Sequence, residues 1–168
     1  NNTTYRYNHI VQEGNGDAII TISDARDRAG NRMISDNSNS FIVDTIYPIL
    51  STITIQSNNS SNDFTKAFEG DEITLSITAS EPITTPNVTI NSNDVPANIN
   101  GSNQNYIAKY TVKDTDIGDV SFRIYNYNDE AGNPGSEYTT TTNGLSVIVI
   151  TKPTVTITGV SSSPASAE

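Results

Sequence analysis

Apolar and polar side chains alternate in short segments along this chain, and Asn, Ser, Gly and Pro stand between the segments. The clearest segment is 72–79, in which apolar residues occupy every second position: Ile73, Leu75, Ile77 and Ala79. This period places all of them on one face of a β-strand. No stretch of the chain repeats apolar residues at the spacing of a helix, so the sequence predicts an all-β protein.

Six further segments follow the same pattern and are predicted strands: 50–55, 87–91, 95–99, 105–113, 119–127 and 145–150. Seven strands separated by turn residues are typical of a two-sheet β-sandwich. The apolar positions of these strands form the predicted core: Ile53, Ile55, Ile73, Leu75, Ile77, Val88, Ile90, Ala108, Tyr110, Val112, Val120, Phe122, Ile124, Val147 and Val149.

The chain also repeats itself. At an offset of 102 residues, Gly16-Asp17 matches Gly118-Asp119, and Asp-Arg-Ala-Gly-Asn at 27–31 matches Asp-Glu-Ala-Gly-Asn at 129–133. Beyond this loop the offset becomes 105, because 41–48 matches 146–153. A period near 105 residues is the length of a sandwich domain, whereas solenoid repeats have periods of about 20 to 50 residues.

The repeat divides the chain into three parts. Residues 1–46 are the predicted C-terminal part of one domain, 47–152 are a complete domain, and 153–168 form the first strand of a third domain or a tail. Strand donation by 153–168 to a neighbouring molecule is a conceivable alternative. It is disfavoured because the first copy lacks four strands and this short segment can supply one.

Several motifs resemble those of prokaryotic immunoglobulin-like repeats. Asp116-x-Gly118-x-Val120-x-Phe122 has the spacing of the immunoglobulin signature at the turn into strand F, with apolar residues in place of its Tyr and Cys. The segments 70–75, 79–83 and 129–135 and the linker 44–48 extend the resemblance over the whole chain. The second linker departs from it, since it has no Asp where the first has Asp44.

Such repeats occur in tandem in bacterial adhesins, and the chain is also similar to archaeal surface-layer proteins, notably acidic ones from marine ammonia oxidisers. The resemblance implies tandem immunoglobulin-like two-sheet β-sandwiches with about seven strands per complete domain. It also implies a structural role in a large cell-surface protein. Neighbouring copies or domains of the same protein are then the expected partners.

Composition supports an exported protein. The 168 residues include 19 acidic and 9 basic residues, and the net charge is −10. Only 17% of the residues are charged, so Asn, Ser and Thr carry the polar surface, as in extracellular or wall-exposed proteins. The acidic balance argues against nucleic acid as a partner. The longest apolar run, 147–150, is far shorter than the roughly 20 residues of a membrane span.

Calcium is the one cofactor that the acidic residues suggest, since carboxylate oxygens are its preferred ligands. Asp114, Asp116 and Asp119 crowd into six residues and repel one another unless a cation bridges them. This segment nevertheless lacks the regular ligand spacing of an EF-hand. Asp44 is a second candidate ligand, because an ion shared with Glu69 or Asp71 would stiffen the junction between domains.

Asp129 is the remaining candidate ligand, together with Asn133 of the same Asp-x-Ala-Gly-Asn segment. A plain turn competes with this interpretation, because Asp can cap the turn and Gly can adopt a positive φ. Glycosylation is also permitted by the sequence. Asn-x-Ser/Thr sequons within the second copy occur at Asn58, Asn59, Asn87 and Asn100.

Catalysis is not expected. The single histidine, His9, has no counterpart in the second copy, where Thr111 stands, so the repeat unit contains no catalytic triad. The absence of cysteine also excludes a thiolate nucleophile and disulfides. The sequence therefore predicts a non-catalytic structural segment of a surface assembly such as an S-layer. A stalk repeat of an adhesin and a calcium- or carbohydrate-binding module remain as alternatives.

Overall fold

The computed structural model describes residues 4–99, 103–151 and 158–159. These residues form strands, turns and loops, which confirms the prediction of an all-β protein. Within these ranges, twelve strands lie in four sheets. No helix that is long and apolar enough to cross a membrane occurs within these ranges. Of the predicted third part, 153–168, only residues 158–159 are described. The sequon at Asn100 lies outside the described residues.

The largest sheet has the strand order β3-β5-β9-β8, and each neighbouring pair is antiparallel. Its strands are β3 (Leu50–Ser57), β5 (Glu72–Ala79), β8 (Ala97–Ile99) and β9 (Asn105–Thr111). The central strand β5 has the predicted bounds, and its alternating apolar residues are buried. The period-two pattern of the sequence therefore identifies the face of this sheet that is packed.

Two smaller sheets each contain three strands. The first has the order β11-β6-β7 and consists of β6 (Asn87–Ile90), β7 (Asn93–Val95) and β11 (Phe122–Tyr125). The second has the order β10-β12-β4 and consists of β4 (Lys66–Ala67), β10 (Gly118–Asp119) and β12 (Ile148–Val149). In the second sheet β12 is antiparallel to β10 and parallel to β4.

Two predicted strands are each divided between two sheets. The segment 95–99 contributes to both β7 and β8, which are separated by Pro96, a residue without an N–H for a β-ladder. The segment 119–127 is likewise divided between β10 and β11. The predicted strand 145–150 retains only β12, and the sequence pattern missed the two-residue strand β4.

One hydrophobic cluster connects the sheets of residues 47–152. All fifteen predicted core residues are buried in it, and six further residues join them: Leu50, Ala67, Ala79, Ile83, Tyr106 and Tyr127. The two tyrosines among these six residues satisfy their hydroxyls, since Tyr106 Oη donates to Ile83 O at 2.6 Å and Tyr127 Oη donates to Ser136 O at 2.8 Å. Each ring therefore adds apolar area to the core without leaving its hydroxyl unpaired.

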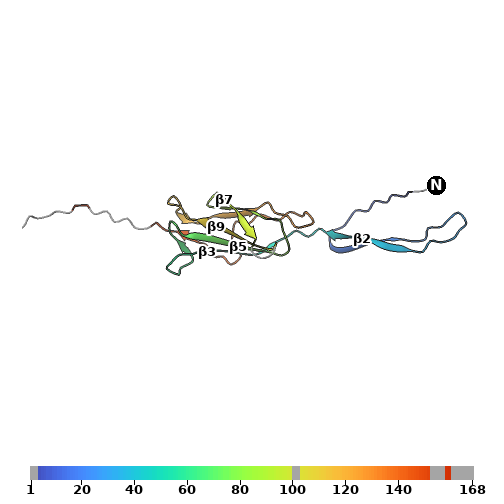
Figure 1. Ribbon diagram of the computed structural model, residues 1–168, viewed down its shortest axis with the longest axis horizontal. Coiled ribbons are helices and arrows are strands. Elements are labelled where there is room, and N and C mark those ends of the chain that lie inside the picture. The colour runs from blue at the N-terminus through green and yellow to red at the C-terminus, as the bar shows by residue number, and fades with distance from the viewer. Residues whose placement is uncertain (1–3, 100–102, 152–157, 160–168) are drawn as a thin grey trace, which may run out of the picture.

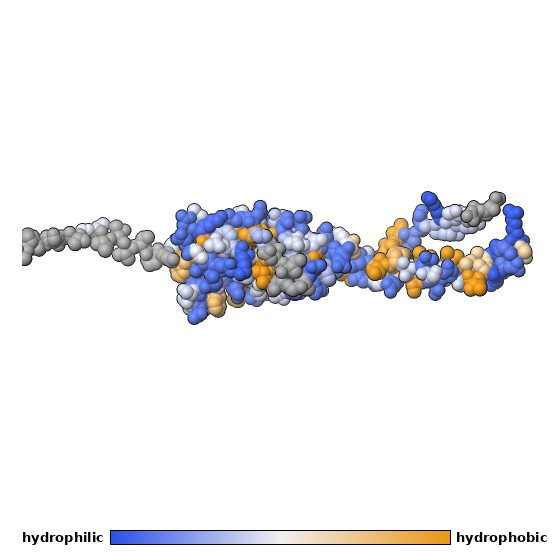
Figure 2. Space-filling view, viewed as in Figure 1, coloured by the Kyte–Doolittle hydropathy of each residue, from blue (hydrophilic) through white to orange (hydrophobic). Residues whose placement is uncertain are grey.

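The first copy is a hairpin that extends away from the rest of the chain (Figure 1). It consists of β1 (Asn15–Ile22) and β2 (Asp36–Asp44), paired in antiparallel orientation. Its large apolar side chains are mostly exposed: Ile19, Ile20, Ile22, Phe41 and Ile42. The space-filling view accordingly shows hydrophobic surface along the hairpin (Figure 2).

The two copies are equivalent in strand register. Ile22 pairs with Asp36 in the hairpin, and Ile124 pairs with Tyr138 in the second copy, which preserves the offset of 102. Closer to the linker, Gly16 pairs with Val43 and Gly118 pairs with Val149. Val43 and Val149 are 106 residues apart, so the structural offset in the last strand is one residue larger than the 105 predicted from sequence.

Candidate site at the junction of the two copies

The turn at 129–133 is built around the carboxylate of Asp129. Its Oδ1 accepts a hydrogen bond from Asn133 N at 2.8 Å, and its Oδ2 accepts one from Asn133 Nδ2 at 2.8 Å. The backbone closes the same turn, since Asp129 N donates to Asn133 O at 3.1 Å and Gly132, with a φ of 96°, donates to Asp129 O at 3.3 Å. An L-residue with a side chain rarely adopts this φ, which explains the glycine.

The turn at 27–31 repeats this geometry in the first copy. Asp27 Oδ1 accepts from Asn31 N at 2.9 Å and Asp27 Oδ2 accepts from Asn31 Nδ2 at 2.8 Å. Gly30 has a φ of 88°. The residues thus form the turn predicted by the simpler of the two interpretations, and both carboxylate oxygens of each Asp are already engaged within the turn.

The second copy uses its turn to hold the linker. One N–H of the Asn133 carboxamide is directed to Asp129, and Nδ2 also donates to Asp44 O at 3.2 Å and Ile46 O at 3.3 Å. The linker is shaped for this contact, because Asp44 Oδ1 accepts from Ile46 N at 3.1 Å. Asn133 therefore connects the backbone at the end of β2 to the turn at 129–133 of the second copy.

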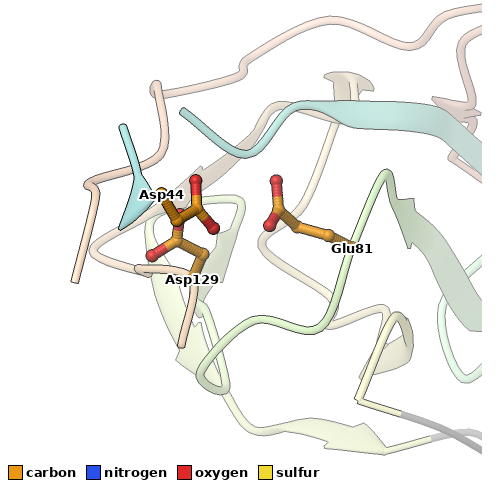
Figure 3. A group of neighbouring side chains, drawn as sticks. All are labelled: Asp44, Glu81 and Asp129. Carbon is orange, nitrogen blue, oxygen red and sulfur yellow. The ribbon is translucent and has the colours of Figure 1, made fainter. Parts of the chain in front are cut away.

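Three carboxylates meet beside this contact. Asp44, Glu81 and Asp129 each place one oxygen within 4.8 Å of the others, and Figure 3 shows Glu81 directed toward the two aspartates. Asp44 ends β2, Glu81 follows β5, and Asp129 begins the turn. In the described part of the chain, none of the three forms an ion pair with a basic residue.

The pKa values of two of these groups shift in opposite directions. Burial, together with the charges of Asp44 and Asp129, raises the pKa of Glu81 above its usual range. Burial also disfavours ionisation of Asp129, but the hydrogen bonds from Asn133 and the neighbouring backbone N–H groups outweigh it and lower the pKa of Asp129. Of these two groups, Glu81 is therefore the more easily protonated.

The cluster brings together two of the five predicted metal ligands, Asp44 and Asp129, with a partner that the sequence analysis did not single out. Ca²⁺ takes six to eight oxygen ligands, so three carboxylates supply part of a coordination shell. The sequence suggested that Asp44 shares an ion with Glu69 or Asp71, but Asp44 groups with Glu81 and Asp129. Glu69 instead lines a hollow near Ile150, where the chain leaves the second copy.

Asp114, Asp116 and Asp119 do not form a comparable group. Asp116 has a structural role, since its Oδ2 accepts hydrogen bonds from Tyr110 Oη and Lys113 N, each at 2.8 Å. Burial and the Asp116 hydrogen bond raise the pKa of Tyr110 to about 12. Asp114 and Asp119 are exposed. The immunoglobulin-like spacing that begins at Asp116 thus coincides with a capped turn.

The predicted glycosylation sites differ in accessibility. Asn58 and Asn87 are exposed. Asn59 is only 3% exposed, its Nδ2 donates to Lys66 O and its Oδ1 accepts from Ser61 N. A glycan on Asn59 is therefore incompatible with this fold, because the modified nitrogen is buried and already engaged. This finding corrects the sequence-based prediction for Asn59.

No protein-family model, curated protein or solved structure matches this chain. The two copies can, however, be compared with each other. Asn31 forms the same turn as Asn133 but contacts no linker among the described residues, so the comparison identifies Asn133 as a residue of the junction. Glu81 escaped sequence analysis since it lies far along the chain from both aspartates, although the segment 79–83 belongs to the motifs quoted for the family resemblance.

Proposed function

We propose that the chain is a non-catalytic structural segment of a large extracellular surface protein, whose immunoglobulin-like domains repeat in tandem to form or space an assembly such as an S-layer. The observation that carries this proposal is the contact of Asn133 with the linker backbone. A repeat that holds the linker entering it acts as a spacer with a defined direction. The hairpin and the exit of the second copy also lie at opposite ends of the elongated shape in Figure 1.

A two-sheet sandwich for 47–152 is supported by the origin of the buried side chains. Ile73, Leu75 and Ile77 come from the four-stranded sheet, while Val88 and Ile124 come from the sheet of β6 and β11. These residues belong to one cluster. Side chains of two sheets that share one core are the defining packing of a sandwich.

The proposed assignment of 1–46 to a further domain is supported by equivalent positions. Ile22 and Ile124 occupy the same register, but Ile22 is 49% exposed and Ile124 is 0% exposed. In the second copy, Ile124 lies on β11, which pairs with β6, and its side chain belongs to the hydrophobic cluster. Strands equivalent to β3 through β9 would cover the hairpin in the same way.

Electron microscopy of the native cell envelope tests the proposal. Gold-labelled antibodies against 47–152 should decorate intact cells of the source organism, and a regular lattice of label is expected for an S-layer. Label at intervals along isolated fibres would instead favour an adhesin stalk. Label confined to permeabilised cells would exclude a surface role of either kind.

A second candidate function is calcium binding at the junction, favoured by the convergence of Asp44, Glu81 and Asp129. An ion bound there would link the linker to two loops of the second copy and raise the melting temperature by mass action on the folded state. Calorimetric titration of the whole chain with CaCl₂ tests this function, with Glu81→Gln as the variant and exposed Glu130→Gln as the matched control. An unchanged melting curve after chelation would exclude structural calcium.

A further inference from the structure

The turn at 27–31 has the same hydrogen-bond geometry as the turn at 129–133, but it contacts no linker among the described residues. Asn31 Nδ2 donates to Asp27 Oδ2, as Asn133 donates to Asp129. The second N–H of Asn133 is directed to the carbonyls of the linker, whereas that of Asn31 has no partner among the described residues. The two turns therefore differ in this second N–H, which binds the linker in the second copy and is available to a partner in the first.

The strands that flank the two turns are also equivalent. Arg26 pairs with Arg32 as Asn128 pairs with Pro134, at the same offset of 102. Asp24, with a φ of 60°, corresponds in the same way to Asn126, with a φ of 56°. The backbone that presents Asn31 is thus the backbone that presents Asn133, including its left-handed residue before the turn.

The side chains around the two turns have different charges. Three of the nine basic residues of the chain lie in the hairpin turn or directly beside it: Arg26, Arg28 and Arg32. Their counterparts in the second copy are Asn128, Glu130 and Pro134. Arg32 contacts Asp24 at 3.3 Å in an exposed pair, and Arg26 Nη1 donates to Gly30 O at 3.2 Å. Such exposed contacts hold the guanidinium groups weakly, so they remain able to pair with another carboxylate.

These features together define the kind of partner that fits. Asn31 offers an N–H donor to backbone carbonyls, which suits an extended peptide. The arginines add positive charge, which suits a carboxylate beside those carbonyls. A highly charged polyanion fits less well, because Asp24 and Asp27 lie close to these arginines in the sequence and the chain carries a net charge of −10. The linker of the present structure has the required features, with carbonyls at Asp44 and Ile46 and the carboxylate of Asp44.

We infer that the turn at 27–31 is a docking site for an extended acidic linker of another repeat. Asn31 binds the backbone of this linker, and Arg26, Arg28 and Arg32 bind a carboxylate of the linker. This inference rests on the proposed function, in which repeats follow one another. The hairpin turn and the turn at 129–133 would then hold linkers by the same backbone contacts but with opposite electrostatics. The first would attract the acidic linker, whereas the second places Asp44 beside two other acids.

Titration of a blocked synthetic peptide of residues 40–50 into the isotope-labelled whole chain tests the inference. The expected result is a saturable NMR shift of the Asn31 carboxamide with no shift of Asn133, whose site is filled by the chain's own linker. Contacts of this size predict a dissociation constant of about 1 mM. Affinity should fall several-fold when the ionic strength rises from about 0.01 M to about 0.15 M, because the screening length falls from about 30 Å to about 8 Å.

Three variants separate the two parts of the site. Asn31→Ala should abolish the saturable shift of the neighbouring backbone, Arg28→Glu should weaken binding about threefold to tenfold, and Asp44→Asn within the peptide should have an effect similar to that of Arg28→Glu. The inference is overturned if Asn31 does not respond, if Asn31→Ala binds like the parent chain, or if inorganic phosphate produces the same saturable shifts. Peptide-induced shifts confined to Ile20, Ile22 and Phe41 would overturn it too, since they would place the peptide on the apolar face. A lattice on native cells combined with any of these results would retain the proposed function and remove only this inference.

Discussion

The two copies have the same hairpin and different surroundings. Both have the same register at Ile22 and Ile124, the same turn at Asp27 and Asp129, and a left-handed residue at Asp24 and Asn126. Only the second copy buries its apolar residues. Local sequence therefore determines the hairpin and its turn, whereas burial depends on strands supplied by more distant segments.

Next to the turn, a pair of hydrogen-bonded positions holds one large and one small residue in each copy. Tyr127 and Gly135 of the second copy correspond to Ala25 and Met33 of the first, and the backbone hydrogen bond between the two positions is 2.8 Å in both copies. A Cβ on Gly135 would lie 1.9 Å from the Tyr127 ring. A large residue faces a small one in each copy, with the sizes exchanged.

The largest expected difference between the copies is in core truncation. Ile124→Ala should destabilise the second copy by about 3 kcal/mol, since it removes a fully buried side chain from the cluster. Ile22→Ala, at the equivalent position, should change stability by less than about 0.5 kcal/mol because half of this side chain is exposed. Urea unfolding followed by circular dichroism measures both. Equal effects would mean that the hairpin is packed against a core of its own.

A smaller difference is expected where the paired residues exchange size. Gly135→Ala should destabilise the second copy by about 2 kcal/mol, because the new methyl group overlaps the buried ring of Tyr127 and the core must shift. Met33→Ala is the matched control and should be nearly neutral. The double variant Gly135→Ala/Tyr127→Phe should not recover stability, since the overlap involves ring carbons and not the hydroxyl. Full stability of Gly135→Ala would contradict the close packing of these two residues.

Much of the second copy could be predicted from its sequence because its strands alternate cleanly. The bounds of β5 and the burial of Ile124 follow directly from period two. Tyr106 and Tyr127 were not among the predicted core residues, and the hydroxyl partners that accompany their burial, Ile83 O and Ser136 O, are set by tertiary structure. Alternation also cannot reveal which sheet a strand joins, so 95–99 was predicted as one strand.

The candidate site was predictable only in part. Asp44 and Asp129 were recognised as oxygen donors, and the turn at 129–133 was recognised from its Gly and Asn. Their convergence with Glu81 depends on how the linker enters the second copy, which no local pattern encodes. The repeat did contain a usable signal, because Asn31 and Asn133 occupy identical motifs in different charged surroundings.

The junction provides a comparison with little change in stability. Asn133→Ala removes the hydrogen bonds to Asp44 O and Ile46 O and should broaden the range of orientations between the hairpin and 47–152. Asn31→Ala removes the equivalent side chain where no linker is held and should leave that range unchanged. The chain has no cysteine, so spin labels on two introduced cysteines report the distance distribution without background labelling. Identical distributions for the two variants would show that Asn133 does not restrain the linker.

The smallest expected effect is the pH dependence contributed by Glu81. Burial and the neighbouring aspartates raise the pKa of Glu81 in the folded state, so the folded chain binds this proton more readily than the unfolded chain. The stabilisation from protonated Glu81 is therefore present below its unfolded pKa and is lost as the pH rises through its folded pKa. Glu81→Gln, which stays neutral, should be more stable than the parent at about pH 7 by less than about 1 kcal/mol and equal to it at about pH 3.5.

Urea midpoints of Glu81→Gln and Glu130→Gln at both pH values measure this difference. Glu130 lies in the same turn segment as Asp129 but is exposed and outside the cluster, so its variant controls for the loss of one negative charge. Asp129 has the opposite linkage, since its pKa is lowered and its contribution to stability is lost as the pH falls. A gain in stability common to both Glu variants would assign the effect to net charge. A gain confined to Glu81→Gln would assign it to the three carboxylates that meet where the linker enters the second copy.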